Sequence, residues 1–347
     1  NDQEVIGILL PKGVWQIVSA LATIYLDFIY MPIEVELSQA QINYCIENVG
    51  VKAVITNEEL ASKITTCDKI IKIEEILQFH NGKDEKYDFK QTSSGLDDVR
   101  IIINTSGSSG YPKSIMLKEK SIVNCLLYTL QIFDIHSNDR AFAITNFCHD
   151  MAIFDTLGMF LCGGSIVIPD ADKIKEPFHW MELIEKYSVS VWNSVPSFME
   201  MLFLSGKSFS NKMKTSLKRI ILGGEFLKTT LAKKIKNEFL NVVLYNVGGP
   251  SETTIWNIYH EVTQEDIQNG VIPYGKPFPN TRYDILNNHN ELCPVGVTGV
   301  MYCRGIGISK GYIGLEEETR RCFYSLEQGQ TDIGYLTGDL GYLRDDG

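Results

Sequence analysis

Residues 104–114 read NTSGSSGYPKS, a loop of small hydroxyl-bearing residues and glycines whose chemistry suits an anion. Gly107 and Gly110 permit positive φ and close backbone approach, so successive N–H groups can turn toward one anion. Lys113 adds a positive charge at the end of the loop. The hydroxyl donors are Thr105, Ser106, Ser108 and Ser109. We expect this loop to bind nucleotide phosphates, although Pro112 replaces the glycine of a P-loop and an ordinary Gly/Ser loop explains the same residues.

Three further groups of polar or small residues follow expected strands: His149-Asp150, Asn193 and Gly223-Gly224-Glu225. Strands are expected at residues 5–10, 51–55, 99–103, 141–145, 165–168, 189–193, 220–222 and 242–246. Helices are expected at residues 15–26, 38–48, 121–133, 177–187, 196–204 and 229–239, the second of them opening with a capping box at Ser38 and Gln41. Strands that alternate with helices form parallel sheets, whose ligands bind at the carboxyl ends of the strands. The three groups are therefore candidate binding residues.

The predicted fold class is α/β, with two doubly wound, helix-covered and mostly parallel sheets. After Gly275 the pattern changes to short strands, such as 282–286 and 300–303, separated by frequent glycines. A small β-rich subdomain is therefore expected at the end of the chain. Approximate subdomain boundaries are predicted at 1–165, 166–270 and 271–347.

The composition of the chain excludes several classes of partner. Its 347 residues carry a formal net charge of −11 with no Lys/Arg stripe, so neither nucleic acid nor an anionic membrane is an expected partner. Eight cysteines without CxxC spacing indicate reduced thiols in a cytoplasmic protein. Cys148-His149 has no clustered ligands around it, so a structural metal centre is not expected there. Neither a secretion signal nor a membrane span is expected.

Several motifs occur in one order along the chain. TSGSSGYPK (105–113) is followed by NVGGPSETTIW (246–256), CRGIGISKGYIG (303–314) and LTGDL (336–340). Residues 10–34, LPKGVWQIVSALATIYLDFIYMPIE, end in an element similar to an AYVPID motif, and Glu291-Leu292-Cys293 is similar to the start of a GELCIGG motif. This combination resembles the adenylate-forming enzymes, and most closely the adenylation domains of nonribosomal peptide synthetases, from Val5 to Gly347.

The resemblance implies a two-step reaction. The carboxylate of an amino acid attacks the α-phosphate of Mg·ATP to give an aminoacyl-adenylate and pyrophosphate, and the acyl group then passes to the phosphopantetheine thiol of a carrier protein. Both reactants are anionic, so catalysis is chiefly charge neutralisation and in-line positioning. The resemblance also implies that the β-rich subdomain is a distorted barrel. The chain looks like a large N-terminal core that begins mid-domain and stops before the small C-terminal domain with its catalytic lysine, so we expect it to adenylate poorly alone.

The resemblance assigns the phosphates of ATP to the loop at 105–113. Its phosphate-binding residues are Thr105, Ser106, Gly107, Ser108, Ser109, Gly110 and Lys113. Thr105 and Lys113 are also expected to be catalytic. Glu252 is the third expected catalytic residue and the expected ligand of Mg²⁺, with a solvated acid at a helix start as the alternative.

The remaining nucleotide-binding residues come from the later motifs. Asn246 would hydrogen-bond the adenine amino group, and Ser251 would touch the α-phosphate. Asp339 would accept both ribose hydroxyls, unless it only caps a turn. Gly224 and Gly248 complete the set. At Gly248 most family members have an aromatic residue, so adenine loses a stacking surface here, and either weaker ATP binding or cover from another side chain should follow.

The resemblance places an amino-acid pocket behind His149-Asp150. Counting back from Gly163-Gly164 selects Asp150, rather than Asp155, as the partner of the substrate α-ammonium, with a surface acid at a helix start as the alternative. A buried carboxylate needs a charged partner, so hydroxy, keto and aryl acids should be rejected. The other pocket positions are Met151, Phe154, Asn193, Ile221, Gly223, Val247, Ile255 and Trp256. A small α-amino acid such as glycine, cysteine, threonine, serine or alanine would fit, and Met151 and Phe154 could equally be core residues of an amphipathic helix.

Two other functions remain open on the sequence alone. The chain could belong to a stand-alone ligase that charges a discrete carrier protein, similar to the D-alanine ligases of cell-wall modification. It could also be a catalytically silent sensor of adenine nucleotides, a reading that Gly248 favours. Asp150 argues against the sensor, because sensing ATP needs no ammonium-binding carboxylate.

Overall fold

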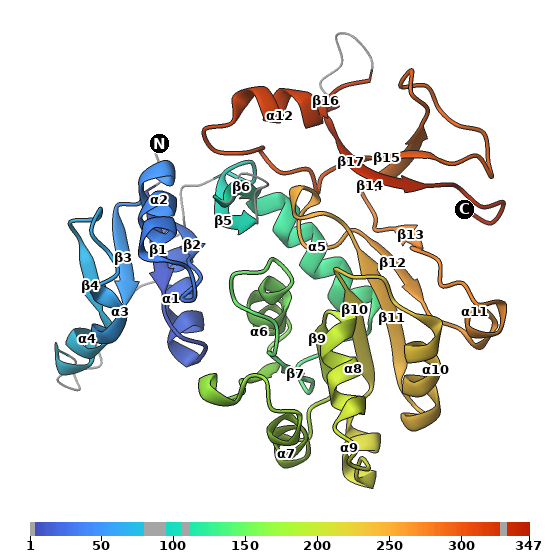
Figure 1. The fold of residues 1–347 in the computed structure, drawn as a ribbon, viewed down its shortest axis with the longest axis horizontal. Helices are drawn as coiled ribbons and strands as arrows, with labels where there is room; N and C mark the ends of the chain where they lie inside the picture. The colour runs from blue at the N-terminus through green and yellow to red at the C-terminus, as the bar shows by residue number, and fades with distance from the viewer. Residues whose placement is uncertain (1–3, 80–94, 106–110, 327–331) are drawn as a thin grey trace. The chain divides into compact units, whose positions relative to one another are not determined.

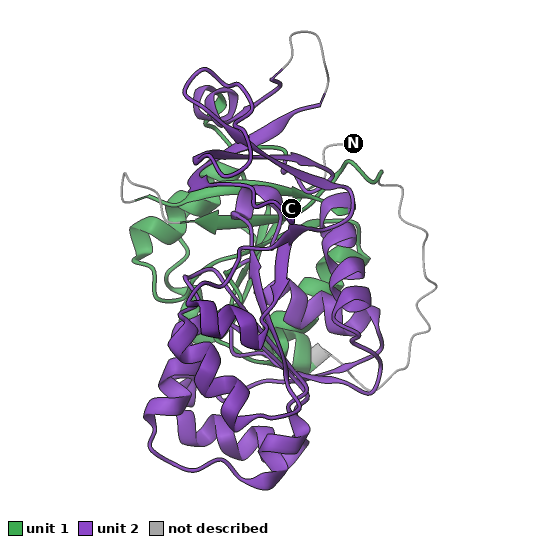
Figure 2. Cartoon of the chain, turned by 90° about the vertical axis from the view of Figure 1, so that its right-hand side faces the viewer, with its two compact units in different colours: residues 1–119, 146–149, 310–316 green, residues 120–145, 150–309, 317–347 purple. Residues whose placement is uncertain are grey.

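The computed structural model describes residues 4–79, 95–105, 111–326 and 332–347. It divides into two compact units, shown in different colours in Figure 2. Unit 1 comprises residues 1–119, 146–149 and 310–316, and unit 2 comprises residues 120–145, 150–309 and 317–347. Both units are thus assembled from segments that are separated in the sequence.

Unit 1 is built on a six-stranded sheet with the order β4-β3-β1-β2-β5-β6. Its strands are β1 Val5–Leu9, β2 Ile29–Pro32, β3 Ala53–Thr56, β4 Ile70–Lys72, β5 Val99–Thr105 and β6 Lys113–Lys118. Its helices are α1 Val14–Tyr25, α2 Gln39–Val49, α3 Glu58–Ala61 and α4 Ile73–Phe79. All neighbouring strands pair in parallel except β5 and β6. The capping box predicted at Ser38 and Gln41 is confirmed at the start of α2.

Unit 2 contains a seven-stranded sheet with the order β13-β12-β11-β10-β9-β7-β8. Its strands are β7 Arg140–Phe142, β8 Ser165–Val167, β9 Val191–Ser194, β10 Arg219–Gly223, β11 Val243–Gly248, β12 Ile258–Glu261 and β13 Lys276–Pro277. The five strands from β11 to β8 are parallel, and β12 and β13 are antiparallel. Both mostly parallel sheets predicted from the sequence are confirmed.

Helices cover both faces of this second sheet (Figure 1). They are α5 Glu119–Ile132, α6 Met159–Leu161, α7 Pro177–Tyr187, α8 Pro196–Leu204, α9 Asn211–Ser216, α10 Thr229–Glu238 and α11 Gln264–Asn269. A π-helical turn, Phe154–Gly158, precedes α6, and 3₁₀ turns occur at Ala171–Lys173 and Ser251–Thr253. On one face, side chains of α7, α8 and α10 pack with Trp192, Ile220 and Leu244 in a single buried cluster. The opposite face of the sheet carries Asn193 and Ile221, two of the predicted pocket residues.

The predicted β-rich part is a four-stranded antiparallel sheet in unit 2, with the order β14-β15-β17-β16. Its strands are β14 Thr281–Leu286, β15 Gly299–Gly305, β16 Phe323–Tyr324 and β17 Gly334–Gly341, and α12 Glu316–Cys322 precedes β16. The α/β fold class with an added β-rich part is thus confirmed.

The subdomain boundaries expected near residues 165 and 270 stay a prediction. Strand β7 pairs with both β8 and β9, so residues 140–142 belong to the second sheet. Strand β6 was not predicted. It follows the hydroxyl-rich segment and pairs antiparallel with β5.

Candidate functional site

The β5–β6 hairpin of unit 1 brings two of the predicted catalytic residues together. Thr105 is the last residue of β5 and pairs directly with Lys113, the first residue of β6. The Thr105 hydroxyl lies 3.5 Å from the Lys113 carbonyl oxygen, and the Lys113 ammonium lies 5.7 Å from the centroid of the Tyr312 ring. A hydroxyl and a cation therefore stand at the two ends of one loop. The predicted loop residues Ser106, Gly107, Ser108, Ser109 and Gly110 lie outside the described residues.

The predicted amino-acid pocket lies within unit 2, on one face of three adjacent strands. Asn193 on β9 pairs with Ile221 on β10, and Gly223 on β10 pairs with Val247 on β11. Because side chains alternate along a strand, these four residues share a face of the sheet. A β-carbon added at Gly223 would lie 2.7 Å from both Cγ2 and the carbonyl oxygen of Val247, so only glycine fits there. The strands therefore bring these four predicted residues together.

Asn193 is the polar centre of this face and is 0% exposed. Its Nδ2 donates to the Met151 carbonyl oxygen at 3.1 Å and to Asp155 Oδ1 at 2.9 Å. These two acceptors fix the orientation of the amide, and Asn193 Oδ1 has no hydrogen-bond partner among the described residues. A buried acceptor of this kind favours a ligand that brings an N–H or O–H donor. Asp155, which is 1% exposed, was not predicted to contact the pocket amide.

Two buried aromatic residues of the predicted pocket pack against each other. The rings of Phe154 and Trp256 have centroids 5.5 Å apart, and Trp256 Nε1 donates to the Thr129 hydroxyl at 2.8 Å. The Cys125 thiol donates to the Trp256 carbonyl oxygen at 3.0 Å. The helix α5 thus fixes the position of Trp256 through two side chains, neither of which was foreseen from the sequence.

Asp150 is half-buried just before the helical segment that contains Phe154. Burial raises the pKa of the Cys125 thiol to about 12, its hydrogen bonds with Trp256 and Thr129 oppose the rise, and the Asp150 carboxylate adds to it. The carboxylate therefore acts electrostatically on the region beside Trp256. Met151 is buried, and its sulfur lies 3.5 Å from the place of a β-carbon at Gly224.

The chain is strained at Thr254 and at Ile255, which is one of the predicted pocket residues. Thr254 and the buried Ile255 have φ of 69° and 63°. A β-branched residue with positive φ is a genuine outlier, and such strain clusters at functional sites. The hydroxyl of Thr254 donates to the Gly307 carbonyl oxygen at 2.8 Å, which helps to hold this conformation.

The predicted adenine-binding residues lie at the end of β11. Asn246 is buried and its Nδ2 donates to the Pro273 carbonyl oxygen at 2.9 Å. Gly248 ends the strand, and the 3₁₀ turn that follows begins with the half-buried Ser251. The segment 270–275, which had no predicted role, therefore lies against the adenine motif.

Asp339 lies on a bulged part of β17. The pairing of β15 with β17 shifts register between Val300 and Tyr302, and Gly338 has φ of 81°. The Asp339 backbone N–H donates to the Thr337 hydroxyl at 3.0 Å, and the side chain of Asp339 is exposed. Bulges redirect side chains near active sites, so this geometry suits a carboxylate that reaches for a ligand.

Glu252 was the predicted ligand of Mg²⁺. It is half-buried in the 3₁₀ turn, where its carbonyl oxygen accepts from the Ser309 N–H at 2.8 Å. Carboxylate oxygens are the ligands that Mg²⁺ prefers, and Mg²⁺ commonly binds through one or two protein carboxylates plus substrate phosphates. The residue therefore fits a shared metal. Among the described residues no group of three His, Cys, Asp or Glu side chains could hold a metal ion alone.

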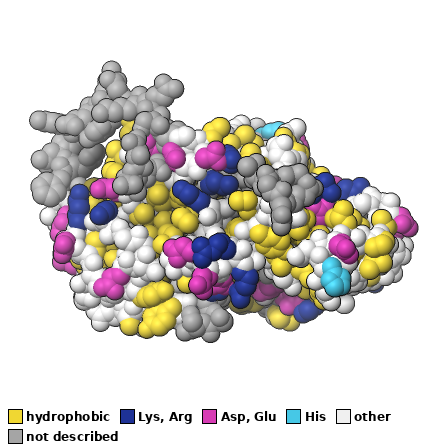
Figure 3. Space-filling view, turned by 90° about the horizontal axis from the view of Figure 1, so that it is seen from above, with side chains coloured by type: hydrophobic (Ala, Val, Ile, Leu, Met, Phe, Trp, Pro, Cys, Tyr) yellow, Lys and Arg dark blue, Asp and Glu magenta, His cyan; other side chains and the backbone are white. Residues whose placement is uncertain are grey.

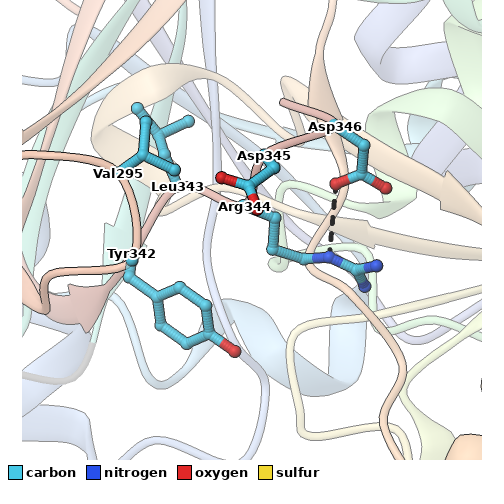
Figure 4. Close-up of a pocket in the computed structure, with 7 residues that line it drawn as sticks. Val295, Tyr342, Leu343, Arg344, Asp345 and Asp346 are labelled. Atoms are coloured by element: carbon cyan, nitrogen blue, oxygen red, sulfur yellow. Dashed lines mark ion pairs between the residues drawn. The ribbon is translucent and has the colours of Figure 1, made fainter.

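A separate pocket of about 400 Å³ lies at residues 295–296 and 342–346. Arg344 Nε and Asp346 Oδ1 form an ion pair of 3.2 Å at its edge (Figure 4). It contains no residue of the predicted site. On the face shown in Figure 3, basic and acidic side chains are interspersed with hydrophobic ones. In the described part of the chain, no helix has both the length and the apolar character needed to cross a membrane.

Comparisons with known proteins agree with the motifs. Bacitracin synthase 1 of Bacillus licheniformis is 30% identical over 347 residues, which are 99% of this chain and 6% of that protein. Pyochelin synthetase PchF of Pseudomonas aeruginosa is 26% identical over 98% of this chain and 18% of that protein. The nonribosomal peptide synthetase FmoA3, in its α-methyl-L-serine-AMP bound form, matches with a TM-score of 0.90 at 25% identity, over 99% of this chain and 38% of that chain.

The chain therefore spans a small part of the curated relatives that it matches. Its resemblance to nonribosomal peptide synthetases is confirmed over nearly its whole length. The family described as AMP-binding enzyme matches residues 1–313. The chain belongs to this AMP-binding enzyme family.

Proposed function

We propose that this chain is the adenylation core of a nonribosomal peptide synthetase and activates a small α-amino acid with Mg·ATP. The amino acid carboxylate attacks the α-phosphorus, the bond to the β-phosphate oxygen breaks, and pyrophosphate leaves. The product is an aminoacyl-AMP. In the second step, the phosphopantetheine thiol of a carrier protein loses its proton and attacks the acyl carbon, which gives a thioester and AMP.

One observation carries the choice of an amino acid as substrate. The buried Asn193 Oδ1 needs a donor, and it lies on the sheet face that also holds Gly223 and Val247. An α-amino acid brings an ammonium, and serine, threonine or cysteine brings a second donor. Leaving such an acceptor unsatisfied costs about 1–3 kcal/mol. A ligand that donates a hydrogen bond to Asn193 Oδ1 should therefore bind more favourably, by that free energy, than a ligand of similar size without a donor.

Packing supports a small substrate. The aromatic side chains of Phe154 and Trp256 would fill much of the pocket, with their ring planes tilted by 54°, and Val247 leaves no room for a side chain at Gly223. Met151, Ile221 and Ile255 complete the lining. The α-methyl-L-serine-AMP named for FmoA3 is an adenylate of a small hydroxylated amino acid, which fits this view. Asp150 pairs with the α-ammonium in this proposal.

The nucleotide roles follow the family motifs. In unit 2, Asn246 binds the adenine amino group, Asp339 the ribose hydroxyls and Ser251 the α-phosphate, with Gly224 and Gly248 beside the nucleotide. Mg²⁺, when bound to Glu252 and the phosphates, would supply charge neutralisation. In unit 1, Thr105, Lys113 and the loop between them bind phosphate oxygens.

Amino-acid-dependent exchange of pyrophosphate into ATP tests this function directly, using the intact protein and each of the twenty proteinogenic amino acids. We expect exchange only with a small amino acid. Asp150→Asn should raise KM for that amino acid about 10- to 100-fold, because a hydrogen bond to a charged group is worth about 1.5–3 kcal/mol. The exposed Asp172→Asn is the matched control and should change nothing. Exchange without amino acid dependence, or none at all despite ATP binding, would refute the proposal.

A further inference from the structure

Gly248 is where the family usually carries an aromatic residue, and in this chain another aromatic residue occupies that space. A β-carbon added at Gly248 would lie 1.9 Å from Cε2 of Tyr274, with Cζ and Oη of the same ring also in the way. No side chain can be placed at residue 248 while Tyr274 keeps its position. The Tyr274 ring therefore occupies the space that a side chain at residue 248 would need.

Three features of the backbone hold Tyr274 there, in the segment that runs from α11 to β13 (Figure 1). The carbonyl oxygen of the preceding residue, Pro273, accepts from the Asn246 amide at 2.9 Å. The following residue, Gly275, has φ of 115°, and a β-carbon on it would lie 1.9 Å from the Tyr259 carbonyl oxygen. Only glycine allows the chain to pass β12 at this distance. The predicted adenine ligand Asn246 thus also anchors the residue before Tyr274.

The start of α11 adds a further anchor upstream. Thr263 and Asp266 form a reciprocal capping box, and His260 lies 2.8 Å from the Asp266 carboxylate. Burial alone would raise the pKa of Asp266, but hydrogen bonds from Thr263 and His260 lower it below its usual value. The segment that carries Tyr274 is consequently tied to the sheet at both ends.

The hydroxyl end of the tyrosine lies against Gly248, and the residue is only partly buried. Burial raises the pKa of Tyr274 to about 12, the Asp339 carboxylate adds to the rise, and the Gly249 N–H opposes it. The phenol is therefore neutral near pH 7. The residue as a whole is 39% exposed, which leaves aromatic surface free to contact a ligand.

We propose that Tyr274 supplies the aromatic surface on which the adenine base of ATP stacks, in place of the aromatic residue that is absent at position 248. This inference rests on the proposed function and adds a residue to its nucleotide site. The ring lies against Gly248 of the adenine motif, and the Asp339 carboxylate, which is assigned to the ribose, acts electrostatically on its phenol. Purines stack on aromatic side chains with offset geometry, and such contacts need a ring that is already held in place.

The test compares ATP binding to variants of the intact protein by isothermal titration calorimetry. Tyr274→Ala should weaken ATP about tenfold, the usual scale of base–aromatic stacking, and leave the weak binding of inorganic tripolyphosphate unchanged. Tyr274→Phe keeps the ring and should recover most of the lost affinity. Tyr187→Ala is the matched control, because that tyrosine is also in unit 2 and is 41% exposed.

A double variant keeps the proposal falsifiable if Tyr274→Ala folds poorly. Gly248→Tyr alone should weaken ATP binding because the new side chain collides with Tyr274, whereas Gly248→Tyr with Tyr274→Ile should restore it. Equal ATP affinity in wild type and Tyr274→Ala, tighter binding in the alanine variant, or an equal loss in Tyr274→Phe would each overturn the stacking role. A wild-type protein that binds no ATP would instead overturn the proposed function, and this inference with it.

Discussion

Asn193→Asp would place a second carboxylate against the Asp155 carboxylate, and the cost follows from the geometry. The amide nitrogen that the new oxygen replaces lies 2.9 Å from Asp155 Oδ1. Two full charges about 3 Å apart repel by about 5–6 kcal/mol at an effective dielectric constant near 20. Holding one proton on the pair costs about 1.4 kcal/mol for each pH unit above the usual carboxyl pKa near 3.9. At pH 7 this is about 4 kcal/mol, so the pair keeps a proton.

The loss of stability should therefore depend on pH. The folded variant binds a proton that the unfolded chain releases, so its stability falls as the pH rises. The penalty of about 4 kcal/mol at pH 7 should shrink to about 1.5 kcal/mol at pH 5. For a unit of this size, these values lower the melting temperature by about 10 °C and about 4 °C.

Thermal unfolding of variant and wild type between pH 4.5 and 8 measures this difference. Asn241→Asp, an exposed asparagine on the same unit, makes the same change of charge and should follow the wild type at every pH. A constant gap between Asn193→Asp and wild type would show that the amide does not face a charged carboxylate. Equal melting temperatures of Asn193→Asp and wild type at every pH would show that Asn193 is not the polar centre of the pocket.

Three other substitutions test the site and its supports. Gly223→Ala should destabilise unit 2 by about 1–3 kcal/mol in unfolding experiments, because the new β-carbon overlaps with Val247. In pyrophosphate exchange, the same variant should raise KM for the amino acid more than KM for ATP. Asp266→Ala should cost about 1–2 kcal/mol at pH 7, and because its pKa is lowered in the folded state, the gap to wild type should close as acid protonates it. Arg100→Leu should lower the melting temperature of unit 1, since the buried guanidinium pairs with two carboxylates, those of Asp27 and Glu119.

Matched controls exist for each of these variants. Gly95→Ala has no atom nearer than 3.9 Å to the new β-carbon, and Asp68→Ala and Arg320→Leu change exposed side chains. All three should unfold like the wild type. A control that loses as much stability as its partner variant would show that the packing and pairing arguments are wrong.

Local sequence signals located most elements and some of their ends. The helices at 177–187 and 196–204 were predicted with the observed limits, because each begins with a proline at its first position and follows a clear strand. Strand β6, residues 113–118, was missed because its apolar run is short and follows proline and lysine, which favour a loop. Its strand conformation depends on pairing with β5, a contact that periodicity does not reveal.

The site shows the same contrast between local and distant information. The family resemblance proposed Asn193, Ile221, Gly223 and Val247 as pocket residues, and strand register brings these four residues together. Tyr274 lay outside every motif, since it meets Gly248 only through the path of the chain around β12. The useful signal was indirect: a glycine where an aromatic is usual, and a tyrosine directly before another glycine.

The edge of β6 has a consequence for how the chain is made. Residues 310–313 cover this edge, with the Lys310 N–H donating to the Met116 carbonyl oxygen at 2.9 Å and the Met116 N–H donating to Gly311 at 3.1 Å. About 190 residues separate β6 from that cover, and ribosomes add about 5–20 residues each second. The edge of β6 thus stays uncovered for roughly 10–40 s during translation, until residues 310–313 have been synthesised. An uncovered edge invites pairing with other chains, so the nascent protein is most open to misassembly in this interval.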